Sequence, residues 1–141
     1  MKIAIRISIL LLFCLQVVLL QAQDTAAAKG KKGKIAAGNT RILYGMASFY
    51  SAKFQGRKTA NGEIFDHKKL TCACNMLPLG TWLKVTNLRN GKTVIVKTND
   101  RLHPKMRRIV DLTKTAAQKL GFIKSGLTRV KVEVLGKKKP V

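Results

Sequence analysis

Acidic residues are scarce in this 141-residue sequence, which has six Asp and Glu against 28 Lys and Arg and a formal net charge of +22. A charge of this size attracts polyanions, so nucleic acid has to be considered as a partner. Aromatic residues are also few, at 6%. The basic loops therefore lack the aromatic side chains on which unpaired bases stack, and the composition argues against a nucleic-acid-binding protein.

Cysteine is nearly absent as well. Of the three cysteines, Cys14 lies in the apolar N-terminal run, which leaves Cys72 and Cys74. Residues i and i+2 of a strand are about 6.5 Å apart, at the outer limit of disulfide geometry. No second cluster of Cys or His has the spacing of zinc ligands. We therefore expect two small half-buried residues rather than a disulfide, and no metal site.

Only one long apolar run is present, residues 7–20, and it follows Lys2 and Arg6. This pattern predicts a signal peptide over residues 1–22, with cleavage after Ala22. The run is too short for a typical transmembrane helix, so we expect no stable membrane span after cleavage; an uncleaved anchor is the alternative. The protein is then exported to the periplasm, the cell surface or the medium. Its charge would suit an anionic wall polymer or membrane surface, or only keep the protein in solution.

Three further segments follow the predicted signal peptide. Residues 23–42 are rich in Ala, Gly and Lys, which is typical of a flexible basic linker. We expect one folded domain over residues 43–136 and a basic tail over residues 137–141.

Within the domain, short strands are predicted at residues 44–50, 70–74, 81–86, 92–97 and 129–135. The Asn90-Gly91 pair predicts a two-residue hairpin turn between the third and fourth of these. One short helix begins at Thr113, which can cap it, and ends at Gly121. Short strands with one small helix argue for a mainly β fold, a small barrel.

Three carboxylates are candidates for chemistry. Glu63 follows the Asn61-Gly62 turn, where it is either a catalytic acid or a solvated loop acid paired with Arg57 or Lys58. Asp100 follows a buried strand, the position from which a rigid element presents a side chain to a groove; the alternative is a turn or an Asp–Arg pair. Asp111 is interpreted as structural, bonded to backbone at the start of the helix.

Glycosidic bond cleavage needs an acid to protonate the leaving oxygen and a second group to take a proton or stabilise charge. Glu63 and Asp100 could converge to supply these two groups. His67 and His103 are the other groups that titrate near neutrality, although each is more often an exposed loop residue.

Several motifs in order resemble the rare lipoprotein A (RlpA)-like domain. They are Gly-Met-Ala-Ser-Phe-Tyr at 45–50, Phe-x-Gly-Arg at 54–57, Thr-Ala-Asn-Gly-Glu at 59–63, Leu-Pro-Leu-Gly-Thr at 77–81, Val-Thr-Asn-Leu-x-Asn-Gly at 85–91, Asn-Asp-Arg at 99–101 and Arg-Ile-Val-Asp-Leu at 108–112. Ala-Ala at 116–117 and Leu-Gly at 120–121 complete the set. The match covers about residues 44–135, and the ordered set is far more specific than any one motif.

This resemblance implies a six-stranded double-psi β-barrel with one or two short helices. It also implies a lytic transglycosylase that cuts the MurNAc–GlcNAc bond of peptidoglycan, preferring strands without stem peptides, to leave a 1,6-anhydro end. No cofactor is implied, and we expect a monomer. Asp100 matches the family's proposed catalytic aspartate and Glu63 a second groove acid. Candidate substrate-binding residues are Asn99, Arg101, Asn61, Tyr50, Cys74 and His103.

The sequence departs from the family pattern at two places. Cys74 stands where the family commonly has a His, and a thiol does not carry protons near neutral pH unless its pKa is lowered. Leu102 and His103 replace the Gly-Pro that usually follows Asn-Asp-Arg, and His103 could supply the missing imidazole. These departures and the high charge keep open an alternative, a non-catalytic, expansin-like module that binds the cell wall.

Overall fold

The computed structural model describes residues 40–141, so the predicted signal peptide and nearly all of the predicted linker lie outside the described residues. The elements are β1 (Ile42–Phe49), the 3-10 helix η1 (Ala52–Phe54), β2 (Thr71–Ala73), β3 (Trp82–Asn87), β4 (Thr93–Asp100), β5 (Val110–Leu112), α2 (Lys114–Leu120) and β6 (Thr128–Gly136). No helix within residues 40–141 is both long enough and apolar enough to cross a membrane.

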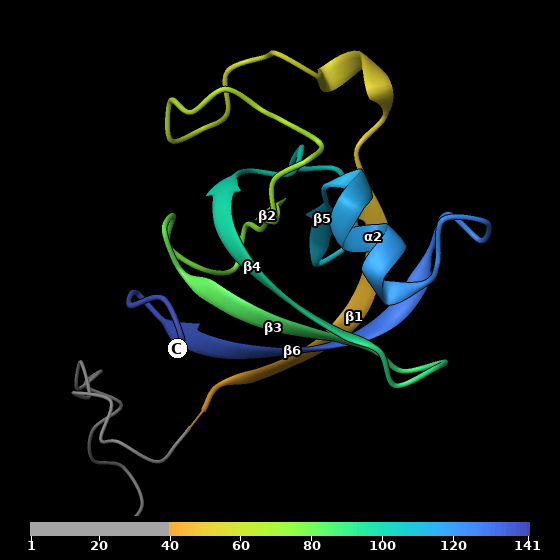
Figure 1. Cartoon of the computed structure of the whole chain (residues 1–141). Helices are drawn as coiled ribbons and strands as arrows, with labels where there is room; N and C mark the ends of the chain where they lie inside the picture. Colours follow the sequence, from red (N-terminus) through yellow and green to blue (C-terminus); the bar gives the residue numbers. More distant parts are fainter. Residues whose placement is uncertain (1–39) are drawn as a thin grey trace, which may run out of the picture. The chain divides into compact units, whose positions relative to one another are not determined.

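Six strands close into one barrel in the order β1-β5-β2-β4-β3-β6 (Figure 1). The β1–β5 and β2–β4 pairs are parallel, and the other four pairs are antiparallel. Closure gives every strand a neighbour on both sides, so this small sheet avoids exposed edges. The predicted mainly β barrel is confirmed.

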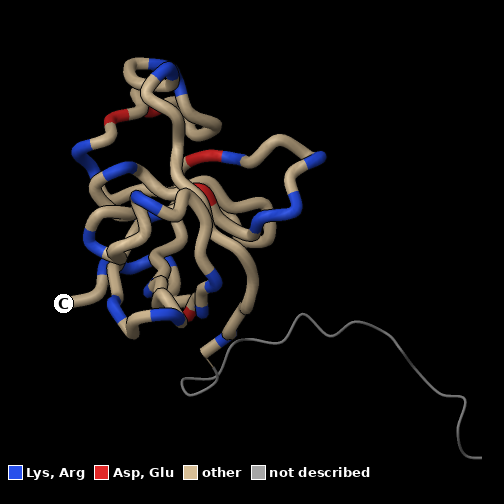
Figure 2. The backbone as a smooth tube through the Cα atoms, turned by 90° about the vertical axis from the view of Figure 1, so that its right-hand side faces the viewer, with Lys and Arg blue, Asp and Glu red and all other residues tan. Residues whose placement is uncertain are grey.

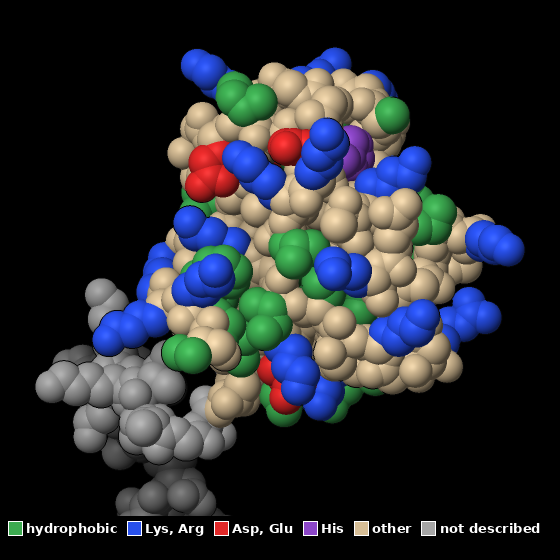
Figure 3. Space-filling view, viewed as in Figure 1, with side chains coloured by type: hydrophobic (Ala, Val, Ile, Leu, Met, Phe, Trp, Pro, Cys, Tyr) green, Lys and Arg blue, Asp and Glu red, His purple; other side chains and the backbone are tan. Residues whose placement is uncertain are grey.

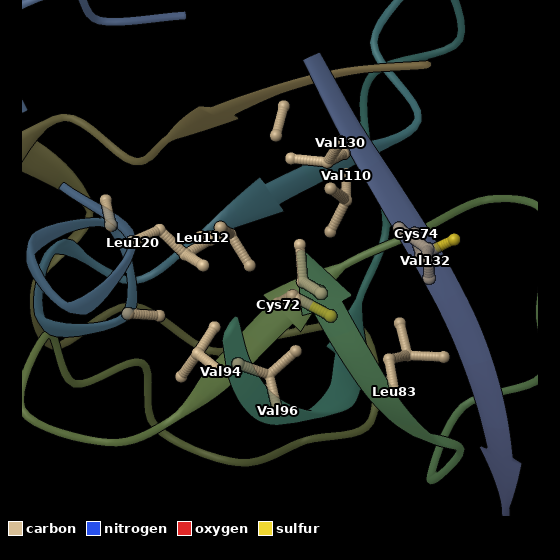
Figure 4. Close-up of a cluster of buried hydrophobic side chains, with 14 of the residues drawn as sticks. Cys72, Cys74, Leu83, Val94, Val96, Val110, Leu112, Leu120, Val130 and Val132 are labelled. Atoms are coloured by element: carbon tan, nitrogen blue, oxygen red, sulfur yellow. The ribbon is translucent and has the colours of Figure 1, made fainter. Parts of the chain in front are cut away.

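Alternating side chains fill the barrel. Leu83 and Val85 of β3 and Val130 and Val132 of β6 are at most 1% exposed. Arg129, which precedes Val130, is exposed, and Lys131 between the two valines is half-buried. The labelled side chains in Figure 4 converge from β2 to β6 and from α2 on the same interior. Each such Val or Leu contributes about 1.5–3 kcal/mol when buried. The alternation predicted for residues 81–86 and 129–135 is confirmed.

The predicted helix is present, but its ends are held differently from one another. Gly121 ends α2 in the left-handed conformation, with φ of 73°, as the sequence predicts. Thr113 stands at the N-cap position, yet its hydroxyl donates to the Lys69 carbonyl oxygen at 2.6 Å and caps no helix N–H group. Thr113 therefore joins the helix to the segment before β2.

Two predictions about local structure were wrong, and one strand was missed. The hairpin turn is longer than two residues. Gly91 N–H donates to the Asn87 carbonyl oxygen, and Asn87 N–H donates to the Lys92 carbonyl oxygen. Gly91 does adopt a positive φ, of 72°. The fourth strand extends to Asp100 instead of ending near Lys97, so Asn99 and Asp100 belong to β4 and not to a loop. The three-residue β5 was not predicted.

Candidate functional site

Asp100 is the last residue of β4 and lies in the wall of a cavity of about 620 Å³. Register places it beside Ala73 of β2, which in turn pairs with Asp111 of β5. The cavity is lined by Phe49, Tyr50, Ser51, Lys53, Phe54, Ala73, Asp100, Arg101, Leu102, His103, Met106, Arg108 and Asp111. The rigid strand end thus presents one carboxylate to a concave surface large enough for part of a carbohydrate.

Both oxygens of the Asp100 carboxylate accept hydrogen bonds. The Tyr50 hydroxyl donates to Oδ2 at 2.7 Å, and the backbone N–H groups of Ala60 and Arg101 donate to Oδ1 at 2.9 and 2.8 Å. Within residues 40–141 no Lys or Arg side chain forms a salt bridge with Asp100. The arrangement is therefore a carboxylate held by three donors rather than the Asp–Arg pair that the sequence left open.

Tyr50 is itself held by aromatic neighbours. Its ring centroid lies 4.4 Å from that of Phe65 and 5.5 Å from that of Phe54. Burial, followed by the hydrogen bond to Asp100, raises the pKa of the Tyr50 hydroxyl far above its ordinary value. The hydroxyl is therefore protonated at every physiological pH and acts as a permanent donor to Asp100.

The loop of residues 59–63 folds onto the end of β4. Thr59 N–H donates to the Glu63 carbonyl at 2.8 Å, which closes the loop, and Asn61 N–H donates to the Asn99 carbonyl at 3.1 Å. The second bond joins the loop to the strand directly beside Asp100. This is how the Ala60 N–H group reaches the Asp100 carboxylate.

The Glu63 side chain faces Asn99 and not the cavity. Its Oε2 accepts from Asn99 Nδ2 at 3.0 Å and its Oε1 from Asn61 Nδ2 at 2.9 Å, while Lys97 Nζ lies 3.9 Å from Oε1. The bonds from Asn99 and then Asn61 lower the pKa of Glu63 below its usual range. The structure thus brings the Glu63 loop to Asp100, but Glu63 is not among the residues that line the Asp100 cavity.

Arg101 lines the cavity while its guanidinium is engaged elsewhere. Its Nη1 donates to the carbonyl oxygens of Cys74 and, at 2.8 Å, of Leu77. The Asn75 side chain also bonds to the backbone of Leu102: its Nδ2 donates to the Leu102 carbonyl oxygen at 3.0 Å, and its Oδ1 accepts from the Leu102 N–H at 2.9 Å. Arg101 therefore holds the segment after β2 against the segment after β4, and so shapes one side of the cavity.

His103 and Cys74, which lie at the two departures from the family pattern, have different surroundings. His103 is exposed and lines the cavity, and its Nδ1 accepts from the Lys105 N–H at 3.3 Å. Cys74 is only 2% exposed, belongs to the hydrophobic core and is absent from the cavity wall. Both Cys72 and Cys74 are free thiols and are buried more deeply than expected. Burial raises the pKa of Cys72 to about 12, with Thr98 opposing this.

Asp111 has the structural role that was predicted, but through different partners. Its carboxylate accepts from the Ser48 hydroxyl at 2.6 Å and from Arg108 Nε and Nη2 at 2.8 and 3.0 Å. The expected bond to backbone at the helix start was wrong, because Asp111 lies within β5. The hydrogen bonds to Asp111 raise the pKa of Arg108. Asp111 thus joins β1 to β5.

Sequence reasoning missed one functional group, the Ala60 N–H. A backbone donor leaves no signal in residue type, and only the fold of residues 59–63 brings it to Asp100. Lys53 and Met106 of the cavity wall were also not singled out, since neither lies in a motif that suggests chemistry.

The closed six-stranded barrel with two parallel strand pairs is a double-psi β-barrel domain. The chain belongs to the lytic transglycolase family, whose model matches residues 42–132. The RlpA-like resemblance is confirmed by curated relatives from several bacteria.

Two of these relatives are each called endolytic peptidoglycan transglycosylase RlpA. The protein of Neisseria meningitidis serogroup A is 48% identical over 99 residues, which cover 69% of this chain and 41% of the relative. That of Pseudomonas aeruginosa strain UCBPP-PA14 is 50% identical over 91 residues, covering 64% of this chain and 27% of the relative. This chain thus spans about two fifths or less of these relatives.

Solved structures agree with the fold. A Streptomyces papain inhibitor superposes with a TM-score of 0.55 at 22% identity, covering 67% of this chain and 94% of the inhibitor. An expansin of Clavibacter michiganensis also gives a TM-score of 0.55, at 23% identity, covering 72% of this chain and 52% of the expansin. At this level of identity the likeness concerns the fold alone.

Proposed function

We propose that this protein is an exported lytic transglycosylase that cleaves the bond between MurNAc and GlcNAc in peptidoglycan glycan strands. The observation that carries the proposal is the Asp100 carboxylate, held by three donors in the wall of a 620 Å³ cavity. The names of the relatives support the reaction class. We place the protein outside the cytoplasm, in the periplasm or at the cell surface, as a monomer without a cofactor.

In the proposed reaction Asp100 moves one proton. The carboxylate accepts the proton of the MurNAc 6-hydroxyl, whose oxygen forms a bond to C1 of the same sugar. The bond from C1 to the bridging oxygen breaks, and Asp100 delivers its proton to that oxygen, which leaves as the 4-hydroxyl of GlcNAc while the carboxylate is restored. Atoms and charges balance without water, and the product carries a 1,6-anhydro ring.

The donors around Asp100 orient it for this exchange. Tyr50 and the two N–H groups direct the carboxylate before substrate arrives, so little reorganisation is needed during the reaction. The rigid end of β4 limits the positions that Asp100 can take. We infer that Tyr50 acts as a donor throughout, because its raised pKa keeps it protonated.

Glu63 assists through position rather than proton transfer. It accepts from the side chains of Asn99 and Asn61, and Asn61 in turn bonds to the backbone of β4. Loss of the Glu63 carboxylate would loosen the loop that carries the Ala60 N–H. Asn99, Asn61 and Arg101 are likewise assigned to shaping the site, and His103 to contact with substrate at the cavity wall.

We infer that strands without stem peptides are the substrate, in cell-wall remodelling or the separation of daughter cells. Such strands expose the lactyl carboxylates of MurNAc, which suit a strongly basic protein. Lys and Arg lie along the whole described chain, whereas the few acids are isolated (Figure 2). The charge pattern thus favours an anionic glycan.

The test compares wild type with Asp100→Asn on intact wall and on peptide-stripped glycan. Mass spectrometry of the soluble products should show 1,6-anhydro ends for wild type. The rate should fall at least about a hundredfold for the variant, because Asn cannot carry the proton. Folded wild type that binds both substrates but releases no such product would overturn the enzymatic proposal and favour the expansin-like wall-binding module.

A further inference from the structure

A second cavity lies on the outer wall of the barrel, around Trp82 at the start of β3. Its volume is about 520 Å³, and it is lined by Lys69, Leu70, Trp82, Ile95, Lys139, Pro140 and Val141. Figure 3 shows hydrophobic side chains among Lys and Arg on the face formed by β3 and β4. None of these residues lines the Asp100 cavity.

Strand alternation explains why apolar groups gather there. Leu83 and Val96 point into the core, so their neighbours Trp82 and Ile95 point outward, and Ile95 is 39% exposed. Trp82 pairs with Lys97 across the β3–β4 ladder. An indole beside aliphatic groups, with ammonium groups close by, forms an apolar surface with a polar margin, the usual composition of a ligand site.

We propose that this cavity is a second carbohydrate subsite, in which the indole of Trp82 packs against the apolar face of a sugar ring. The occupant is a peptide-stripped glycan strand, and this identity rests on the proposed function. Lys69 and Lys139 would face the lactyl carboxylates of that strand. Within residues 40–141 neither lysine forms a salt bridge with Asp or Glu.

Both cavities are lined by residues of β4, Asp100 in one and Ile95 in the other. Asp100 stands three residues after Lys97 on β4, which is about 10 Å in an extended strand, and Lys97 is paired with Trp82. Glu63 lies between them: it contacts Lys97, and after the bonds from Asn99 and Asn61 the charges of Lys97 and Lys69 also lower its pKa. A glycan of a few sugar units could therefore extend from Asp100 past Glu63 to Trp82.

The sole tryptophan of the chain makes the subsite directly observable. Asp100→Asn protein is titrated with peptide-stripped glycans of increasing length, so that binding is followed without cleavage. The emission of Trp82 should shift and saturate, and the affinity should rise as the glycan becomes long enough to reach both cavities. Calorimetry on the same samples measures binding without relying on the indole.

Variants at Trp82, in the Asp100→Asn background, separate packing from folding. Trp82→Ala should weaken calorimetric binding of long glycans about tenfold, whereas Trp82→Phe should keep it within about threefold because a ring remains. Circular dichroism verifies that both are folded. Tyr44→Ala removes an aromatic side chain that is 66% exposed on β1, outside this cavity, and should leave binding unchanged.

The outcomes distinguish this proposal from the proposed function. The subsite would be overturned if the Trp82 emission did not change while calorimetry detected binding. It would also be overturned if Trp82→Ala did not weaken binding in the Asp100→Asn background. Either result would count even if wild type cleaves glycan. Trp82-dependent binding by a wild type that releases no anhydro product would support the subsite and overturn the reaction. Glycans that bind none of these variants would overturn the subsite, whereas release of anhydro ends by wild type still decides the reaction.

Discussion

At the scale of single residues, the site depends on how one carboxylate is held. Asp100 and Asp111 look equivalent in the sequence, since both lie in a basic segment. Both line the same cavity. The structure gives Asp111 a two-bond contact with the charged Arg108, whereas Asp100 meets only neutral donors. Only the second arrangement leaves a carboxylate available to a substrate proton.

The first prediction concerns the Tyr50 hydroxyl. Tyr50→Phe removes the donor to Asp100 Oδ2 and keeps the ring that packs on Phe65. Because a hydrogen bond to a charged group contributes about 1.5–3 kcal/mol, kcat should fall roughly ten- to a hundredfold while KM changes little. Release of anhydro ends from stripped glycan measures the rate.

Tyr44→Phe is the matched control, because it removes the hydroxyl of the other tyrosine, which is exposed on β1. The control should have the activity of wild type. Equal rates for Tyr50→Phe and Tyr44→Phe would mean that the bond from Tyr50 does not orient Asp100.

The second prediction concerns Glu63 and pH. Its pKa is lowered in the folded protein from the ordinary value of 4.5, mainly by Asn99. The folded state therefore binds its proton less readily than the unfolded state. The stabilisation is complete above about pH 4.5 and is lost as pH falls through the folded-state pKa. Since the side chain is 39% exposed, solvent screens the effect, which should stay below about 1 kcal/mol.

Urea unfolding at several pH values tests this. Wild type should lose stability more steeply than Glu63→Gln below pH 4.5, and the two curves should run parallel above it. Parallel curves throughout the acid range would contradict the proposed bonds to Asn99 and Asn61.

At the scale of elements, the parallel β1–β5 pair closes the barrel and supports Asp111. Strand β1 approaches the segment before β5 closely at Gly45, where an added methyl group would lie 2.5 Å from Ile109 Cγ2. Gly45→Ala should therefore cost about 1–3 kcal/mol of unfolding free energy, as overpacking typically does. Urea denaturation measures the loss.

A double-mutant cycle verifies the cause. Ile109→Ala removes the atoms that clash, so the double variant should be more stable than the sum of the two single changes implies. Additive free-energy changes would show that Gly45 is needed for another reason.

Elements with a strong local signal could be predicted from the sequence. The alternating valines of β6, the β3–β4 hairpin and the glycine that ends α2 are all local patterns. Strand β5 could not be found, because three residues carry too short an alternation and its parallel partner is distant in sequence. The longer hairpin turn depends on bonds to the Asn87 backbone, which residue types do not reveal.

In the candidate site, too, features with a local sequence signal could be predicted, whereas those that depend on distant contacts could not. Asp100 and Glu63 could be singled out as rare acids at suggestive positions, and the family resemblance strengthened both. Which way each faces could not be predicted, because it depends on the loop of residues 59–63 folding onto β4 across about forty positions of sequence. Cys74 was expected to be half-buried and is buried more deeply, since it belongs to the core that the closed barrel encloses.

At the scale of the whole molecule, the high positive charge, +22 for the full sequence including the predicted signal peptide, should govern attachment to the wall. Binding to insoluble peptidoglycan, measured by co-sedimentation, should weaken several-fold between low and high salt, because salt screens exposed charges. Asp100→Asn should sediment like wild type, since the substitution changes the large net charge by only one. Binding that does not respond to salt would contradict an electrostatic attachment.

The central claim is that Asp100 directs an internal ring closure rather than hydrolysis. Peptide-stripped glycan is digested by wild type in water enriched in heavy oxygen, and the new ends are analysed by mass spectrometry. The account predicts 1,6-anhydro-MurNAc ends without the heavy isotope, and none of them from Asp100→Asn. Reducing ends that carry heavy oxygen, or anhydro ends formed equally by the variant, would contradict it.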